Sequence, residues 1–297
     1  MTKGVMTNDR TGVGTISSFG HNFKHNLIRG FPLMTHKKVS FRSVMAELVW
    51  FLSGSTDNNN LRKLGATIWD EWANEDGQLG PIYGHQWRTF NGVSRDECNT
   101  ADQITSLIYE IINNPDSRRL VVSAWNPLVL PNTRVPTSDS VDDGKQALAP
   151  CHVMFQVYIK NGTMDLMWTQ RSVDIVNGLP FNIASYAMLL YILCAITGYK
   201  PGNVIGSFGD IHVYNNHLTP EIVGQIKARK PFPLPRVHDD VLSDYFRLPV
   251  VTRKNYDTIA KHVDKWFNKN ASTTVKVLTG AIYDYKHHDA IKSPVAV

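Results

Sequence analysis

The sequence predicts an α+β fold in which helices pack on a large mixed β-sheet. Segments with helical spacing of apolar residues occur beside segments rich in β-branched and aromatic residues, without a regular βαβ alternation. The chain has 297 residues, of which 42% are hydrophobic, which is enough for a substantial core. Because no long linker or internal repeat interrupts it, we expect one domain over residues 1–297.

Helical patterns occur at three places. Residues 41–54, FRSVMAELVWFLSG, carry recurring apolar residues and stop at a glycine, as a core helix does. Residues 102–113, DQITSLIYEIIN, place Ile104, Leu107, Ile108 and Ile111 on one stripe before an asparagine-proline pair. The apolar stretch 183–197 follows Pro180 and is too short to span a bilayer, so we expect a buried helix there.

Strands are predicted at residues 120–125, 152–162 and 163–172. The Asn161-Gly162 pair between the last two is a strong hairpin signal. Residues 131–147, PNTRVPTSDSVDDGKQA, are rich in turn formers, poor in large apolar residues and look inserted, which predicts an exposed surface loop.

Charge and cysteine content narrow the classes of function. The net charge of +5 is spread along the chain, which favours small phosphorylated ligands over nucleic acid. The 3 cysteines include no CxxC pair, so we expect neither a disulfide framework nor a cysteine metal site. The first residues, MTKGVMTNDRTGVG, do not resemble a signal peptide, and we expect a cytoplasmic protein without a membrane segment.

Cys151 is the candidate nucleophile. It stands in LAPCHVMF beside His152 at the start of a predicted strand, and arginines elsewhere could stabilise its thiolate. A cysteine beside a histidine also suits a cysteine protease or a glutaminase. A free cysteine is more often a small buried residue, which fits Cys194, whereas Cys98 lies in a polar loop.

Arginines beside serine or glycine form a candidate phosphate site. Taken singly, each is more typical of a surface ion pair, but together they suit bidentate capture of a phosphate monoester. The hydroxyl of Ser172 would be a further donor. These arginines are Arg10 in NDRTGVGT, Arg118 and Arg119 in PDSRRLVV, and Arg171 in QRSVD.

Two further features suit a catalytic pocket. Glu47 lies within an apolar helical run, so it is either ion-paired or an acid with a shifted pKa. Asp210, His212 and Tyr214 alternate in GDIHVYNNH and would share one face of a strand. No other strong metal ligands stand nearby, so recognition of sugar hydroxyls is favoured over a metal site.

Motifs spread along the chain resemble those of the thymidylate synthase family, folate-dependent enzymes that methylate deoxyuridine monophosphate (dUMP). They run from Arg10 to the C-terminal Pro294-Val295-Ala296-Val297. In order they read NDRTGVGT, AELVWFLSGST, TIWDEWA, LGPIYGHQWR, PDSRRLVVSAWNP, LAPCHVMFQ, QRSVD, GLPFNIASYAML and GDIHVYNNH. The resemblance implies a thymidylate synthase-like fold, a sheet-to-sheet homodimer, 5,10-methylenetetrahydrofolate as co-substrate, and no metal.

The resemblance also implies residue roles. Cys151 would add to C6 of the uracil and Glu47 would handle protons at the uracil O4 and a folate nitrogen. Tyr83 and His152 would belong to the network around the reacting ring, and Asp174 and Arg171 would complete the catalytic set. The implied dUMP ligands are Arg10, Arg171 and Ser172 at the phosphate, Arg118 and Arg119 at the partner's phosphate, His212 and Tyr214 at the sugar, and Asn182 at the base. The implied folate positions are Lys37, Trp69, Asp174, Asn177, Gly178, Phe181, Ala296 and Val297.

Asn182 indicates which base is bound. A side-chain amide can donate to O4 of uracil and accept from its N3–H, whereas cytosine presents the opposite pattern at both atoms. A site built for such hydrogen bonds rejects the wrong base strongly. We therefore expect dUMP as the substrate rather than dCMP.

Two departures from the family pattern bear on the product. Thr169 replaces a usual tyrosine, and Asn177 replaces a leucine of the apolar folate wall. A looser, wetter pocket would let water quench the exocyclic methylene at C5, which gives 5-hydroxymethyl-dUMP in place of the methyl product. These replacements slightly favour a dUMP hydroxymethylase, a type of relative found in viruses with modified thymine in their DNA.

The alternatives remain open on the sequence alone. Trp69, Asn182 and the C-terminal valine favour an ordinary thymidylate synthase. A catalytically idle RNA-binding or regulatory homologue is a third possibility, which the intact Cys151, Glu47 and arginine set disfavour.

Overall fold

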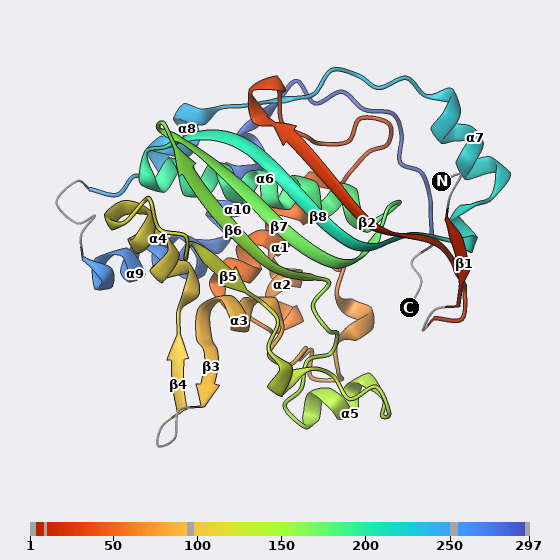
Figure 1. Ribbon diagram of the computed structural model, residues 1–297, viewed down its shortest axis with the longest axis horizontal. Coiled ribbons are helices and arrows are strands. Elements are labelled where there is room, and N and C mark those ends of the chain that lie inside the picture. Colours follow the sequence, from red (N-terminus) through yellow and green to blue (C-terminus); the bar gives the residue numbers. More distant parts are fainter. Residues whose placement is uncertain (1–3, 9–10, 94–97, 250–254, 295–297) are drawn as a thin grey trace.

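The structure is a computed structural model that describes residues 4–8, 11–93, 98–249 and 255–294. It is built on a six-stranded sheet with the order β1-β2-β8-β7-β6-β5 (Figure 1). β7 and β8 are parallel, and the other neighbouring pairs in this sheet are antiparallel, which confirms the predicted mixed sheet. Its strands are β1 (Val5–Thr7), β2 (Thr15–Asn26), β5 (Val121–Ser123), β6 (His152–Lys160), β7 (Thr163–Asp174) and β8 (Lys200–Tyr214).

The β6–β7 hairpin forms where the sequence predicts it. Asn161 and Gly162 have φ angles of 52° and 74°, both left-handed, as a type I′ turn requires. The parallel strands β7 and β8 need a long crossover, which α6 (Gly178–Thr197) provides. Two small sheets pair β3 (Phe90–Val93) with β4 (Cys98–Ala101) and β9 (Arg236–Val237) with β10 (Ile282–Tyr283).

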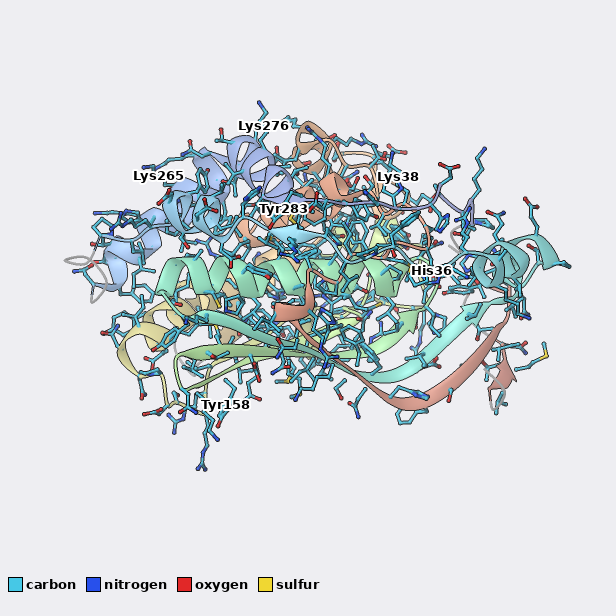
Figure 2. The ribbon with its side chains drawn as sticks, turned by 90° about the horizontal axis from the view of Figure 1, so that it is seen from above. His36, Lys38, Tyr158, Lys265, Lys276 and Tyr283 are labelled. Carbon is cyan, nitrogen blue, oxygen red and sulfur yellow. The ribbon has the colours of Figure 1, made fainter. Side chains whose placement is uncertain are left out.

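The helices that the structure describes gather mainly on one face of the sheet, with α6 and α1 (Phe41–Ser53) at the centre (Figures 1 and 2). The predicted helix at 41–54 ends at Gly54, which adopts the left-handed conformation. The helix predicted after Pro180 already begins at Gly178, because proline fits the first turn, where its missing N–H has no helical partner. The other helices are α2 (Asn58–Leu64), α3 (Tyr83–Thr89), α4 (Gln103–Asn113), α5 (Thr137–Asp142), α7 (Pro220–Ala228), α8 (Asp239–Tyr245), α9 (Tyr256–Asp264) and α10 (Ala271–Gly280).

α6 is apolar on all sides because it lies inside the core. It is long and apolar enough to cross a membrane by composition alone, but 72% of its apolar window is buried within the fold. A helix that contacts the sheet on one side and other helices on the other has no polar face to present to water. α6 is therefore a core helix.

The opposite face of the sheet carries exposed apolar side chains. Val121, Gln156 and Met167 lie side by side across β5, β6 and β7, so they share one face. Met167 is 38% exposed and Tyr158 60% exposed, and Tyr158 points away from the helices in Figure 2. This face is where the predicted sheet-to-sheet dimer would form, and that arrangement stays a prediction.

Candidate active site

A cavity of about 900 Å³ opens beside Cys151 at the end of β7 and β8. Parallel pairing brings Ser172 opposite Asp210, so the ends of both strands meet at one place. Asp210, His212 and Tyr214 all line the cavity, as their alternation in the sequence predicted. The cavity thus joins the nucleophile candidate to the predicted phosphate and sugar ligands.

The segment 131–147 forms part of the wall of this cavity. Thr133, Val135 and Thr137 line the cavity, and residues 137–142 form the short helix α5. Ser140 and Gln146 are buried, with exposed fractions of 1% and 0%. Most other residues of the segment are exposed, and its polar groups bond to one another, as Ser140 Oγ does when it accepts the Asn132 N–H at 3.0 Å. That the segment is an inserted surface loop stays a prediction.

Arg171 holds the turn that carries Cys151. Its backbone N–H donates to the Cys151 carbonyl at 2.8 Å, and its guanidinium donates to the carbonyls of Pro150 and Ala149 at 3.0 and 2.9 Å. The guanidinium also lies 5.7 Å from the ring centre of Trp125. A planar fork with several donors can hold a turn and still face a cavity, so Arg171 fixes the position of the nucleophile.

Glu47 is a buried acid that Trp69 and Tyr83 connect to Cys151. It is 7% exposed within α1, and the indole N–H of Trp69 donates to its Oε1 at 2.7 Å. Burial raises the pKa of Glu47 to about 7, and the hydrogen bond from Trp69 only partly opposes this. A carboxyl group with such a pKa can both give and take a proton near neutral pH.

Tyr83 and His152 connect this layer to Cys151. The Tyr83 hydroxyl oxygen accepts the Cys151 backbone N–H at 2.7 Å, and its ring stacks on His152 with centroids 4.3 Å apart. His152 Nδ1 pairs with the Tyr186 hydroxyl at 3.0 Å. Burial lowers the pKa of His152 to about 3, so its ring stays neutral. A cysteine-protease type of thiolate-imidazolium pair is therefore not supported.

The remaining nucleotide ligands differ in how they are placed. His212 pairs through Nδ1 with the Asp210 carboxylate at 3.1 Å, which leaves Nε2 for a ligand. Arg118 and Arg119 are exposed just before β5 and do not line this protomer's cavity. Arg10 lies outside the described residues. A role for Arg118 and Arg119 at a partner's site stays a prediction.

The folate positions Asp174, Lys37 and Asn177 cluster at the start of α6. The Asp174 carboxylate accepts the backbone N–H groups of Val176 and Asn177 at 2.9 and 3.3 Å. Burial lowers the pKa of Lys37, while the nearby Asp174 raises it. Asn177 Oδ1 accepts from Lys37 Nζ at 3.2 Å and from Ser293 Oγ at 2.6 Å.

These contacts tie the C-terminal segment to the site. His217 pairs through Nε2 with the Pro294 carbonyl at 2.6 Å, and its Nδ1 lies 3.8 Å from the Asp174 carboxylate without a hydrogen-bond partner of its own. Gly178 lies where a side chain would contact Asp174 and the Asn182 amide. Phe181 packs partly buried against the core. Ala296 and Val297 lie outside the described residues.

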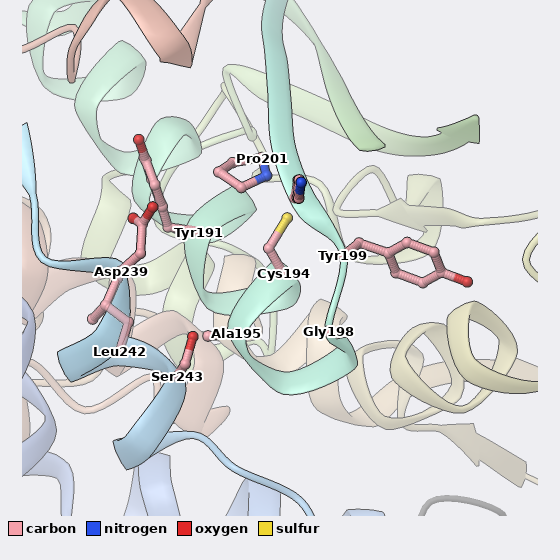
Figure 3. A pocket seen from close by; sticks show the side chains of 10 residues that line it. Tyr191, Cys194, Ala195, Gly198, Tyr199, Pro201, Asp239, Leu242 and Ser243 are labelled. Carbon is pink, nitrogen blue, oxygen red and sulfur yellow. The ribbon is translucent and has the colours of Figure 1, made fainter. Parts of the chain in front are cut away.

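Cys194 lies in different surroundings from Cys151. It lines a cavity of about 210 Å³ near the C-terminal end of α6, with Tyr191 and Asp239 (Figure 3). Burial raises the pKa of the Cys194 thiol, so the group stays protonated. Cys194 is a small buried residue, and Cys151 is the nucleophile candidate.

Comparisons with known proteins agree with this arrangement. The sequence model of the thymidylate synthase family matches residues 1–297. The chain belongs to the thymidylate synthase family. Curated relatives include the thymidylate synthases of Francisella tularensis subsp. holarctica strains FTNF002-00 / FTA, OSU18 and LVS. Each is 42% identical over 294 residues, which cover 99% of this chain and 95% of the relative.

Thymidylate synthases use methylenetetrahydrofolate as co-substrate, and the residues at the start of α6 fit such a molecule. His217 Nδ1 has no hydrogen-bond partner and lies 3.8 Å from the Asp174 carboxylate, and such polar groups suit the polar edge of a heteroaromatic ring system. Among the described residues, no group of three or more histidine, cysteine or acidic side chains could hold a metal ion.

The two residues that depart from the thymidylate synthase pattern lie on different elements, β7 and the start of α6. Thr169 pairs with Met154 and Ser207 and lies on the face of β7 opposite Trp168 and Gln170, which point toward the core. Asn177 lies at the start of α6 and is held by Lys37 and Ser293. Neither side chain lines the cavity beside Cys151, and the idea that both replacements open one water site stays a prediction.

Some residues of the thymidylate synthase site were not found from the sequence. Ser293 donates to Asn177, from which it is 116 positions away in the sequence. Gln170 on β7 donates to Asn182 on α6. The position of Gln170 in the QRSVD motif was the only available signal for it. Ser293 gave none, because a serine near a chain end is typical of solvent-exposed positions.

The raised pKa of Glu47 predicts a pH dependence of stability. The carboxyl group is protonated more readily in the folded state than at its ordinary pKa of 4.5. Its contribution is therefore fully present below pH 4.5 and is lost as the pH rises to about 7, by about 3 kcal/mol in total. Denaturant unfolding of wild type and Glu47→Gln at equal protein concentration checks this. The unfolding free energy of wild type minus that of the variant should fall by about 3 kcal/mol between pH 4.5 and about 7.

His152 acts in the opposite direction, because its lowered pKa makes stability rise with pH up to its ordinary value of 6.5. Both proteins contain His152, so subtracting one curve from the other removes its effect. A difference that stays constant across the range would contradict the raised pKa of Glu47.

Proposed function

We propose that this protein is a cytoplasmic thymidylate synthase, a single catalytic domain that converts dUMP and methylenetetrahydrofolate into dTMP and dihydrofolate. One observation carries the proposal: Cys151 opens into the same cavity as Ser172, His212 and Tyr214, and Tyr83 and Trp69 link it to Glu47. Nucleophile, nucleotide ligands and a proton carrier with a pKa of about 7 are what this reaction needs.

In the proposed complex the strand ends bind the nucleotide. Ser172 and the remaining donors of Arg171 hold the phosphate, and His212 Nε2 and the Tyr214 hydroxyl hold the deoxyribose hydroxyl. Asn182 pairs with O4 and N3–H of the uracil. Because Arg171 also holds the turn of Cys151, phosphate binding and the position of the sulfur depend on one side chain.

The chemistry begins at Cys151. Its sulfur bonds to C6 of the uracil, and the electron pair of the C5–C6 double bond makes C5 a nucleophile. Methylenetetrahydrofolate supplies the carbon that C5 captures and afterwards the hydride that completes the methyl group. Glu47 donates a proton toward O4 as negative charge develops there, and Tyr83 holds the Cys151 turn from below. The C5 proton is released to solvent as the bond between the transferred carbon and the folate nitrogen breaks. Hydride addition to that carbon then expels the sulfur from C6 as a thiolate, which restores the C5–C6 double bond.

The surroundings of Asn177 support methyl formation rather than hydroxylation. Its oxygen already accepts from Lys37 and Ser293, so both lone pairs are used by protein donors and this oxygen offers no acceptor to a water molecule. The side chain of Thr169 lies on the other face of the sheet. With these two replacements accounted for, the preference for a hydroxymethylase that the sequence suggested loses its support.

Product identification tests the proposal. Purified protein with dUMP and methylenetetrahydrofolate should yield dTMP and dihydrofolate, whereas 5-hydroxymethyl-dUMP with tetrahydrofolate would show the alternative reaction. Cys151→Ser should abolish turnover and still bind dUMP, because the hydroxyl group is a far weaker nucleophile than a thiolate. Turnover that persists in Cys151→Ser would disprove its role.

Sharing of sites across a homodimer can be tested by mixing variants. Arg118→Ala and Cys151→Ser subunits are each expected to be inactive alone, but a mixed dimer holds one site with both groups intact. Random mixing should recover about a quarter of wild-type activity, because half of the dimers are mixed and each has one working site. Arg247→Ala, which removes another exposed arginine, is the control and should be active alone. Mixed dimers without activity would count against the sharing.

The Asn177→Leu variant tests the product choice. We expect dTMP to remain the main product, while kcat/KM for methylenetetrahydrofolate falls about tenfold because two hydrogen bonds to the folate side of the site are lost. Ser293→Ala removes only one of those donors and should give a smaller loss. A hydroxymethyl product in wild type that disappears in Asn177→Leu would show that the asparagine chooses the outcome.

A further inference from the structure

A chain of buried hydrogen bonds leads to the amide of Asn182. The indole N–H of Trp168 donates to Gln170 Oε1 at 3.1 Å. Gln170 Nε2 donates to Asn182 Oδ1 at 3.0 Å and to the Ser172 carbonyl at 3.1 Å. Trp168 and Gln170 are buried, with exposed fractions of 0% and 3%. Trp168 and Gln170 are therefore shielded from water, and Asn182 is the partly buried end of this relay of three side chains.

Donor and acceptor chemistry fixes the direction of this relay. An indole nitrogen can only donate, so the end of Gln170 that faces Trp168 must be its oxygen. The Gln170 amide nitrogen then faces two acceptors, and the end of Asn182 toward Gln170 must be its oxygen. The oxygen and nitrogen ends of an amide have nearly the same shape, so packing alone does not set which end points where. The N–H of Trp168 sets it at the start of the relay.

Packing keeps the indole in place. The Trp168 ring stacks on Tyr186 with centroids 5.0 Å apart and 11° between the planes, and Phe208 meets it edge-on at 5.5 Å. Gly206 lies beside Trp168 on β8, and a Cβ there would stand 2.8 Å from the indole ring. Glycine at 206 thus leaves the room that the indole occupies.

We propose that Trp168 is a positioning residue for base selection: through Gln170 it holds the Asn182 amide in the orientation that reads uracil rather than cytosine. In this orientation Asn182 Nδ2 donates to O4 of uracil, and the second lone pair of Oδ1 accepts from N3–H. Reversing the amide would present the pattern that cytosine requires. The inference rests on the proposed function, since it concerns how that site chooses dUMP.

The experiment measures the dissociation constants of dUMP and dCMP for the full-length protein by calorimetry. In Trp168→Phe the Gln170 oxygen loses its donor while an aromatic ring still fills the space. The dissociation constant of dCMP divided by that of dUMP should fall about tenfold. The reason is that a buried acceptor left without its donor no longer fixes the orientation of the Asn182 amide. Trp50→Phe is the matched control: Trp50 is also buried, and its N–H donates to the Asp57 carbonyl at 3.1 Å, outside the relay. That variant should keep the wild-type ratio.

A second variant separates the relay from general packing. Gln170→Met keeps the volume but removes the hydrogen bonds, and it should lower the ratio at least as much as Trp168→Phe. The double variant, Trp168→Phe with Gln170→Met, should lower the ratio of dissociation constants no further than Gln170→Met alone, because Trp168 acts only through Gln170. Additive losses would mean that Trp168 affects binding through packing, which would overturn the inference.

The outcomes distinguish the inference from the proposed function. A wild-type protein that does not prefer dUMP to dCMP overturns the proposed function and the inference with it. A selective wild type whose ratio survives in Trp168→Phe overturns the inference alone. If Trp168→Phe fails to fold, Gln170→Met decides, and an unchanged ratio there overturns the relay.

Discussion

Each polar side chain buried beneath Cys151 needs a hydrogen-bond partner, and the arrangement of the site depends on this constraint. Leaving such a group unpaired costs about 1–3 kcal/mol, so partners are fixed along with the groups themselves. Glu47 is paired with Trp69, the Cys151 N–H with Tyr83, and His152 with Tyr186. Each partner is an aromatic residue with one polar atom, which satisfies the buried group and fills the core at once.

Because these partners are neutral aromatic residues, no charged partner offsets the effect of burial on the pKa values of Glu47 and His152. A lysine or arginine beside Glu47 would hold its carboxylate ionised, whereas the neutral Trp69 N–H offsets only part of the cost of burial. The acid therefore titrates near neutral pH, while the same burial keeps His152 uncharged. One desolvated layer thus yields one group that can exchange protons and one that cannot.

Local sequence patterns predicted much of the fold. The α1 and α4 helices, the Asn161-Gly162 hairpin and the shared face of Asp210, His212 and Tyr214 follow from periodicity and turn chemistry, which act over a few neighbouring residues. The short helix α5 within the segment 131–147 was not predicted, because it is held by contacts rather than by apolar spacing. Composition alone cannot show which polar segment will find a cavity to line.

The partners of the site residues were the least predictable part. Asn177 looked unsuited to an apolar wall, but its side-chain oxygen accepts hydrogen bonds from Lys37 and Ser293. These residues are 140 and 116 positions away from it in the sequence. The family resemblance named Lys37 and Asn177 as folate positions without connecting them. Such pairs depend on how the whole chain packs, so a single sequence gives no local signal for them.

The apolar face of the sheet around Val121, Tyr158 and Met167 has a thermodynamic consequence. Members of this family are generally dimeric, and association across that face would remove these side chains from water. Folding and assembly would then share one equilibrium, so the melting temperature would rise with total protein concentration. Stability would be a property of the solution as well as of the chain, and dilution alone would act as a denaturant.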